Sequence, residues 1–399
     1  YYINAKINYK IGKKDRIFAS MYYGKDVMEY SDLFGFNWGN ATATLRWNHL
    51  YGKKLFSNTS IVFSDYQYGI QIDASGTKLD ISSGIRDING KMDFTYYLNP
   101  SNTFSFGISS IFHHFRLGTL INESNEALNN KLPNRDAFES GIYFSNKQTL
   151  GNHWALEYGL RLSMFNAVGP GETYGYDAQG NVNDTTIQKN LNAYKTYFGW
   201  EPRLGVNYII NESMSIKAGY NRNYQYLHLL SNSTSSQPTD LWVPSSEIMK
   251  PQIADQVSLG YFVNFGKNNM FEAYVDLYYK NFQNLVDYKN GAEVIFNKFY
   301  EGDLAFGKGY SVGAEFFLKK RKGKFTGWLG YTISRTRRTI PGINDGKEYS
   351  ARQDRTHDIS IVLMYEINKR ITISTNWVFY TGDAVTWPSG KYTVDGNLV

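Results

Sequence analysis

The chain has 399 residues, a formal net charge of +6, 17% aromatic residues and 20% charged residues. This length suits two ordinary domains or one large all-β domain. No stretch approaches about 18 consecutive apolar residues, which excludes a transmembrane helix. Cysteine is absent, which excludes disulfides and thiolate chemistry, and the scattered Lys and Arg argue against nucleic-acid binding.

Apolar and polar residues alternate along sixteen stretches, which predicts sixteen β-strands. Most have ten or more residues, longer than the usual strand of a soluble sheet and suited to a tilted bilayer crossing. In chain order the predicted strands are 1–12, 16–25, 40–51, 55–67, 85–98, 103–117, 136–147, 153–166, 198–210, 214–227, 253–265, 270–282, 306–319, 325–337, 356–367 and 370–381.

The connections alternate between short turns and long polar loops. The short turns are rich in Gly, Asn, Lys and Pro, as tight hairpins require. The long loops fall at about 26–39, 68–84, 118–135, 167–197, 228–252, 283–305 and 338–355. This order predicts an up-and-down transmembrane barrel with short periplasmic turns and long external loops.

The two faces of each strand differ in chemistry. In 154–165, for example, Trp154, Leu160 and Leu162 alternate with Glu157 and Arg161. A Lys or Arg facing lipid at the bilayer midplane costs roughly 2–4 kcal/mol. The apolar side chains of each strand are therefore expected to face lipid, and the alternating charged side chains are expected to face a polar lumen.

The predicted topology places both ends of the chain on the external side. Complete bacterial barrels normally keep both termini in the periplasm. We therefore expect this chain to be the interior part of a longer barrel, with strands missing at both ends.

Several segments resemble the barrel of a TonB-dependent outer-membrane receptor of the Bacteroidota type. They are FNWGNATATLRWNHLYGKKLFSNTSIVFSDYQY (36–68), WEPRLGVNYIINESMSIKAGYNRNYQYLHLLSN (200–232), YKNFQNLVDY (279–288) and DRTHDISIVLMYEINKRITISTNWVFYTGDAVTWPSGKY (354–392). The resemblance covers essentially the whole chain. It implies a barrel of about 22 strands with a plugged lumen, in which residues 1–399 are barrel and the N-terminal plug and closing strands lie elsewhere.

The resemblance also implies a function. Such receptors import scarce nutrients, namely siderophores, haem, vitamins, glycans or peptides, across the Gram-negative outer membrane. The expected partners are outer-membrane lipid and lipopolysaccharide, the nutrient, and the TonB–ExbB–ExbD complex through an N-terminal segment outside this chain; a surface lipoprotein could join them. The alternative is a passive diffusion porin of 16 strands, which would need periplasmic termini and a constriction loop folded inward. The sequence displays neither.

Three groups of residues are candidate sites. The first consists of lumen-facing charges that could contact the plug or merely satisfy one another: Arg161, Glu201, Arg203, Lys217, Glu272 and Asp276. The second consists of loop side chains that could contact a ligand or pack loop against loop: Tyr174, Tyr176, His228, Trp242, Tyr288 and Tyr300. The third consists of Arg335 and Arg337, which parity places on the outer face where lipopolysaccharide phosphates would lie.

No cofactor and no enzymatic activity are expected. His113 and His114 point to opposite faces, so they cannot share a metal, and parity separates His357 from Asp354 and Asp358. The stretch 176–184 echoes a calcium loop only faintly, because the terminal bidentate Glu is missing. No catalytic sequence motif occurs.

Overall fold

The structure is a computed structural model that describes residues 1–31, 33–74, 77–123, 125–177, 179–231, 240–292, 297–384, 393–394 and 397–398. Within these residues, eighteen strands form one sheet in which every pairing is antiparallel. Sixteen of them are long: β1 (Tyr2–Ile11), β2 (Asp15–Tyr30), β3 (Phe34–Leu50), β4 (Leu55–Ala74), β5 (Thr77–Asn99), β6 (Asn102–Asn122), β8 (Arg135–Leu150), β9 (Trp154–Val168), β12 (Ala193–Asn211), β13 (Met214–Gln225), β16 (Gln252–Phe265), β17 (Phe271–Tyr288), β18 (Leu304–Lys320), β19 (Phe325–Thr339), β21 (His357–Asn368) and β22 (Ile371–Tyr380).

The remaining elements are short and lie in the connections. Two extend the main sheet: β7 (Asn130–Lys131) pairs with β6, and β20 (Tyr349–Ser350) pairs with β19. The others are the hairpins β10 (Gly171–Tyr176) with β11 (Val182–Gln188), β14 (Leu227–Leu230) with β15 (Leu241–Pro244) and β23 (Thr393–Val394) with β24 (Asn397–Leu398), and the 3₁₀ helices η1 (Glu126–Leu128), η2 (Tyr300–Asp303) and η3 (Asn344–Gly346).

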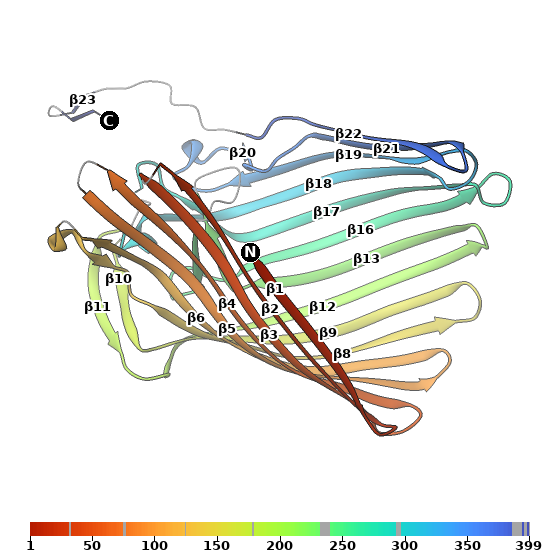
Figure 1. The fold of residues 1–399 in the computed structure, drawn as a ribbon, viewed down its shortest axis with the longest axis horizontal. Helices are drawn as coiled ribbons and strands as arrows, with labels where there is room; N and C mark the ends of the chain where they lie inside the picture. The colour runs from red at the N-terminus through yellow and green to blue at the C-terminus, as the bar shows by residue number, and fades with distance from the viewer. Residues whose placement is uncertain are drawn as a thin grey trace.

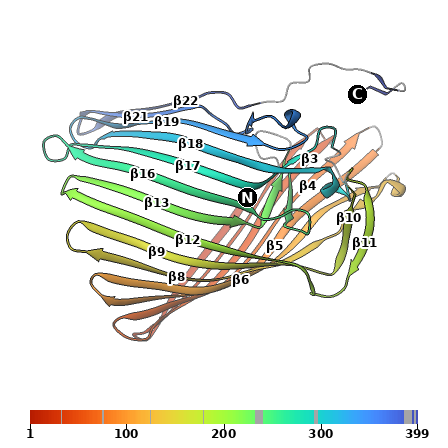
Figure 2. The ribbon, with the colours of Figure 1, turned by 180° about the vertical axis from the view of Figure 1, so that it is seen from behind.

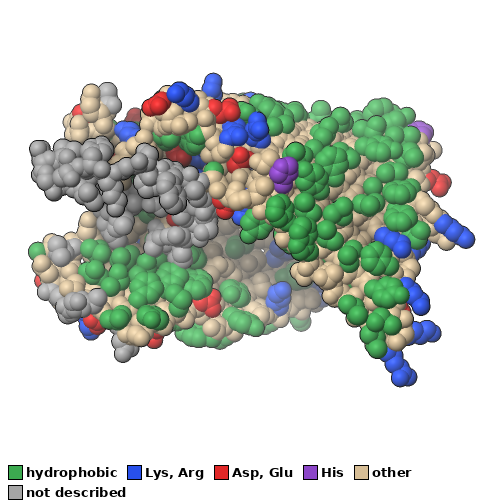
Figure 3. Space-filling model, turned by 90° about the horizontal axis from the view of Figure 1, so that it is seen from above, with side chains coloured by type: hydrophobic (Ala, Val, Ile, Leu, Met, Phe, Trp, Pro, Cys, Tyr) green, Lys and Arg blue, Asp and Glu red, His purple; other side chains and the backbone are tan. Residues whose placement is uncertain are grey.

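The long strands lie side by side in chain order and curve around a hollow (Figures 1 and 2). The short turns gather at one end of the molecule and the long connections at the other. Among the described residues β1 pairs with β2 alone and β22 with β21 alone, so these two strands are the edges of an open sheet. Seen from above, the hollow is visible between the two walls (Figure 3).

All sixteen strands predicted from the sequence are present, and so is the alternation of short and long connections. The predicted ends of several strands were wrong. Residues 68–84 were expected to form a loop, yet β4 runs to Ala74 and β5 begins at Thr77, and β2 and β3 likewise fill much of 26–39. Above the membrane both faces of a hairpin meet water, so backbone pairing continues there without the apolar alternation that marked the strands.

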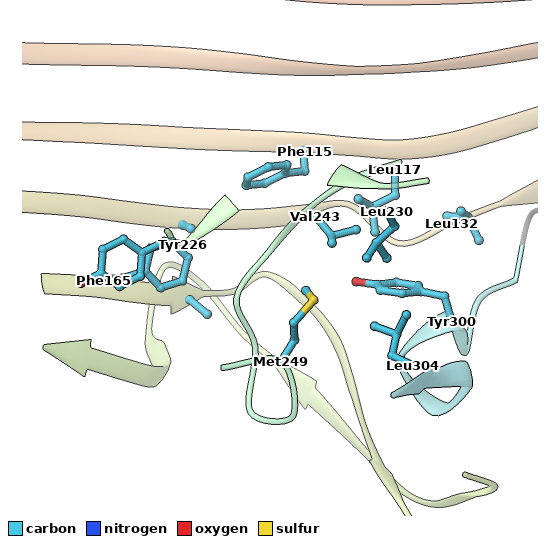
Figure 4. Packing of buried hydrophobic residues seen from close by; sticks show 12 residues of the cluster. Phe115, Leu117, Leu132, Phe165, Tyr226, Leu230, Val243, Met249, Tyr300 and Leu304 are labelled. Atoms are coloured by element: carbon cyan, nitrogen blue, oxygen red, sulfur yellow. The ribbon is translucent and has the colours of Figure 1, made fainter. Parts of the chain in front are cut away.

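The buried hydrophobic core lies at the long-loop end and not in the middle of the wall. All of β1 is exposed, as are the outward side chains of many other strands. The principal cluster of buried residues comprises Phe115, Leu117, Leu132, Ala137, Phe165, Ala167, Tyr226, Leu230, Val243, Met249, Tyr300 and Leu304. We call this set the loop core; it combines the loop ends of wall strands with side chains from the connections (Figure 4).

Among the described residues, no helix has the length and apolar character needed to cross a membrane.

Candidate functional site

A chain of four charged side chains crosses the lumen face of β8, β9 and β12. Arg161 lies 3.6 Å from Glu139 and 3.6 Å from Glu201, and Arg203 lies 4.0 Å from Glu201. The strands themselves set this geometry, because Arg161 and Glu201 are direct cross-strand partners. Two acids and two bases balance in charge, but the Arg203 side chain remains 59% exposed. The structure thus brings three predicted lumen residues into one group that ends at Arg203, which also donates to the Asn223 side chain at 3.3 Å.

The other predicted lumen charges are separate from this group. Glu272 pairs at 2.6 Å with Arg321 in the turn after β18. The Lys217 ammonium lies 4.4 Å from the centre of the Phe262 ring. Asp276 has a buried Oδ1 atom without a hydrogen-bond partner.

Between Lys217 and Asp276 the lumen wall carries a shallow groove of about 390 Å³. Part of its floor is bare backbone, because Gly205 and Gly219 are cross-strand partners, whereas Gly260 is covered by the Phe262 ring. Bare backbone flanked by unsatisfied polar atoms is suited to contact with another polar chain segment.

The β14–β15 hairpin folds inward, a feature that the sequence does not display. It leaves the wall between β13 and β16, yet β15 contacts β6 and β8, and β14 contacts β17. Val243 of this hairpin is fully buried, and Leu230 is 4% exposed. In Figure 4 both side chains point toward Leu117 on β6 and toward Tyr300. Sequence parity could not reveal these contacts, because they join residues far apart in the chain, more than 100 positions in the case of Leu117.

The six predicted loop residues differ in accessibility. His228 and Tyr300 are buried, at 0% and 4% exposure, Tyr174 is also buried, and Tyr176 and Tyr288 are partly buried. Trp242 is 39% exposed. These loops therefore pack mainly against one another, and Trp242 is the residue of the six with the most surface open to a ligand.

His228 fixes the base of the inward hairpin. Its Nε2 atom lies 2.9 Å from the Ser245 hydroxyl, and its Nδ1 atom accepts a hydrogen bond from Gln252 at 3.1 Å. Burial lowers the pKa of His228 to about 4. The side chain is therefore neutral at physiological pH and holds the hairpin through neutral hydrogen bonds.

Two further clusters in the loops were missed by sequence reasoning. Asp287 accepts a hydrogen bond from Arg352 at 2.6 Å and one from the Tyr349 hydroxyl at 3.2 Å, and Arg338 lies 3.5 Å away. Arg352 also donates to the Ser231 carbonyl, so one carboxylate and one guanidinium join three loops.

The second cluster places the buried Arg135 near Glu301 and Tyr300. Burial raises the pKa of the Glu301 carboxyl, and the Arg135 charge opposes that rise. Neither cluster follows a local sequence pattern.

The two outer-face arginines have different surroundings. Arg337 donates to the Ser350 hydroxyl and lies 3.9 Å from Glu348. The Arg335 side chain is exposed, and within the described residues it has neither a hydrogen bond nor an ion pair.

The described residues contain no group of three or more side chains that could hold a metal ion. His113 contacts Asp87 at 2.8 Å, and His114 contacts Asp136 at 2.6 Å. His357 contacts the Tyr331 hydroxyl, and Asp354 accepts from the Thr336 amide. In the stretch 176–184, the Asp177 carboxylate accepts from the backbone amides of Gln179 and Asn181, which makes it the cap of a tight turn.

An open wall of long antiparallel strands, apolar outside and charged inside, defines a transmembrane β-barrel of the outer membrane. Comparison with known proteins gives the family. Residues 6–398 match the model of the TonB dependent receptor-like β-barrel, and the chain belongs to this family. It is therefore a receptor barrel of the Gram-negative outer membrane, in a family of transporters and not of enzymes. No curated protein matches the chain.

Solved structures with the same fold include proteins described as iron and copper transporters and as siderophore receptors. The FrpB iron transporter from Neisseria meningitidis aligns with a TM-score of 0.67 at 12% identity, over 94% of this chain and 59% of its own. The alcaligin receptor FauA from Bordetella pertussis aligns with a TM-score of 0.65 at 13% identity, over 96% and 60%.

The ferric-catecholate import receptor Fiu from E. coli aligns with a TM-score of 0.64 at 13% identity, over 94% of this chain and 63% of its own. The chain thus spans about three fifths of the length of the structures it matches. At such low identity these matches show the fold alone.

Proposed function

We propose that this chain is the barrel of a TonB-dependent importer of the Bacteroidota type. The complete protein would carry a scarce nutrient, a siderophore, haem, vitamin, glycan or peptide, across the outer membrane with energy relayed by TonB–ExbB–ExbD. The observation that carries the proposal is the family match over residues 6–398. The Bacteroidota assignment rests on the sequence segments quoted above. A surface lipoprotein fits the same proposal as a partner at the external mouth.

An N-terminal plug inside a barrel of about 22 strands is part of the proposal. The lumen wall supports it, because Arg203 and Lys217 are exposed and present charge to the interior. The bare-backbone groove over Gly205 and Gly219 offers hydrogen-bonding surface to a plug loop.

The proposed mechanism needs no chemistry on the nutrient. The external loops capture the ligand, and TonB then displaces the plug so that the ligand passes through the lumen. Among the candidate ligand residues Trp242 is the best placed, because it is exposed on a hairpin that the loop core holds inside the mouth. An exposed indole stacks on sugar rings, aromatic groups or cations.

A passive porin is the competing function, and one observation favours it: the β14–β15 hairpin folds inward as a constriction loop would. A self-contained porin of 16 strands would also have to close its sheet. Among the described residues β1 and β22 do not pair with each other, and the family match argues for the importer.

The test compares growth of a strain lacking the gene with its parent, each nutrient class in turn being the limiting source. The importer predicts a defect for one class that deletion of tonB reproduces. In the complemented strain, Trp242→Ala should raise the half-saturating nutrient concentration by about fivefold, which corresponds to roughly 1 kcal/mol of lost stacking. Trp200→Ala, which removes an indole from the outer wall, is the matched control. Uptake that persists without TonB would favour the porin.

A further inference from the structure

The outward side chains of β16 to β19 form rows that cross the sheet. Three successive rows, from the loop side toward the short turns, are Asp255–Asn281–Tyr310–Arg337, then Val257–Tyr279–Val312–Arg335, then Leu259–Leu277–Ala314–Ile333. The first row is mainly polar and the third is apolar. Arg335 is therefore the one charged member of the row at which the apolar surface begins.

The charged neighbours of Arg335 on this wall are already paired. Arg337 is held by Glu348 and Ser350. Arg355, just before β21, lies 2.8 Å from Asp383, and its guanidinium stacks 4.0 Å from the centre of the Tyr380 ring. Arg222 lies 2.7 Å from Asp255. Since Arg335 has no acidic partner among the described residues, its positive charge is uncompensated.

A groove of about 680 Å³ extends from Arg335 over the apolar surface. Ala314 lies on its floor between Leu277 and Ile333, and this small side chain leaves the wall hollow where its neighbours are large. Leu259, Leu277 and Ile333 are 51%, 48% and 40% exposed. Figure 3 shows hydrophobic side chains gathered along the outer wall and charged ones nearer its ends.

We infer that Arg335 and this groove bind one lipopolysaccharide molecule, with a lipid A phosphate on the guanidinium and an acyl chain over Ala314. Arginine matches phosphate oxygens with two parallel donors. A long side chain in the first apolar row can extend its charge to headgroup level while its stem stays on apolar surface. The loop-side position of the row selects the outer leaflet, where lipopolysaccharide is the phosphate-bearing lipid. The site lies outside the lumen and does not depend on the transport proposal.

The test uses the full-length receptor, purified in detergent and freed of bound lipid. Fluorescent diphosphoryl lipid A is titrated into the wild type and into the variants Arg335→Ala, Arg335→Lys, Arg337→Ala and Ala314→Trp. We expect Arg335→Ala to weaken binding by about tenfold, the effect of losing one charge-assisted contact. Arg335→Lys should weaken binding less than Arg335→Ala, since lysine keeps the positive charge but lacks the two parallel N–H donors of arginine.

Arg337→Ala is the matched control and should stay within about twofold, because its guanidinium is already occupied by protein. Ala314→Trp should weaken binding although it leaves every charge in place. Dephosphorylated lipid A should bind the wild type as weakly as the diphosphoryl form binds Arg335→Ala. Heat-modifiable migration on gels verifies that each variant is folded.

Equal affinity of Arg335→Ala and wild type would overturn the assignment. So would equal losses in the two arginine variants, which would indicate a diffuse basic surface. Phosphatidylglycerol that competes as well as lipid A would overturn lipopolysaccharide as the occupant.

Discussion

The wall and the loop core of this protein reach order in opposite ways. In the wall, adjacent side chains alternate between lipid and lumen, and β1 has no buried residue at all. In the loop core, side chains from β6, β9, β14, β15 and η2 bury one another, and Phe165, Val243 and Met249 have no exposed surface. The wall is therefore determined by lipid on one face and the aqueous lumen on the other, and the loop core by contacts between distant parts of the chain. Substitutions in the two regions should follow different rules.

The largest difference between the loop core and the wall is expected when an aromatic ring is removed. Phe165 stacks on Tyr226 with ring centres 5.1 Å apart, and the Tyr226 hydroxyl lies 2.7 Å from Ser163. Phe165→Ala would leave a cavity and should lower the free energy of unfolding by about 3–5 kcal/mol.

Urea unfolding in lipid vesicles, followed by tryptophan fluorescence, measures this loss. The control is Phe106→Ala on the outer wall, where the ring is 36% exposed and lipid can fill the space. A loss as large for Phe106→Ala as for Phe165→Ala would abolish the distinction between the regions.

An introduced arginine should lower the free energy of unfolding by different amounts on the two faces of the wall. Leu259 is 51% exposed on the outer face of β16, and Ser258 is its neighbour on the lumen face. Leu259→Arg should cost up to about 2–4 kcal/mol of unfolding free energy, since the guanidinium would face lipid. Ser258→Arg should cost less than about 1 kcal/mol. The same vesicle unfolding assay compares them, and a reversed order would mean that the faces have been exchanged.

The loop core should respond to pH where the wall does not. The pKa of His228 is about 4 in the folded loop, below its ordinary value of 6.5. A depressed histidine pKa means that the undocked hairpin binds the proton first, so docking is strongest above pH 6.5 and weakens as the pH falls toward 4. At pH 5 the loss should be about 2 kcal/mol relative to pH 7.

Hydrogen exchange at residues 227–230 and 241–243 reports hairpin docking, with the central residues of β17 as the wall reference. His228→Asn should remove most of the pH dependence because it cannot take up a proton. A protection factor of the wild-type hairpin, corrected for the intrinsic exchange rate, that is equal at pH 5 and pH 7 would contradict the burial of His228.

Strands and faces could be predicted from the sequence because each depends on neighbouring residues. Alternation located all sixteen long strands, and parity assigned Arg161, Glu201 and Arg203 to one face. Parity also placed Arg335 on the outer wall, where it lies opposite Val312. These assignments need only the period of a strand and the cost of placing charge in lipid.

The tertiary structure decided which of two equivalent side chains is free. Arg335 and Arg337 have the same face and the same chemistry in the sequence, but Glu348 and Ser350 return through a loop to occupy Arg337 alone. Tyr174, Tyr300 and Trp242 are all loop aromatics, and folding buries the first two and leaves Trp242 exposed.

The sequence by itself thus determined a membrane barrel, because lipid and water impose their pattern on every strand locally, residue by residue. Only the tertiary structure decided that β14 and β15 fold inward and that Asp287 joins three loops. Those features depend on contacts between residues far apart in the chain. A loop surrounded by water has no alternation of apolar and polar residues from which they could be predicted.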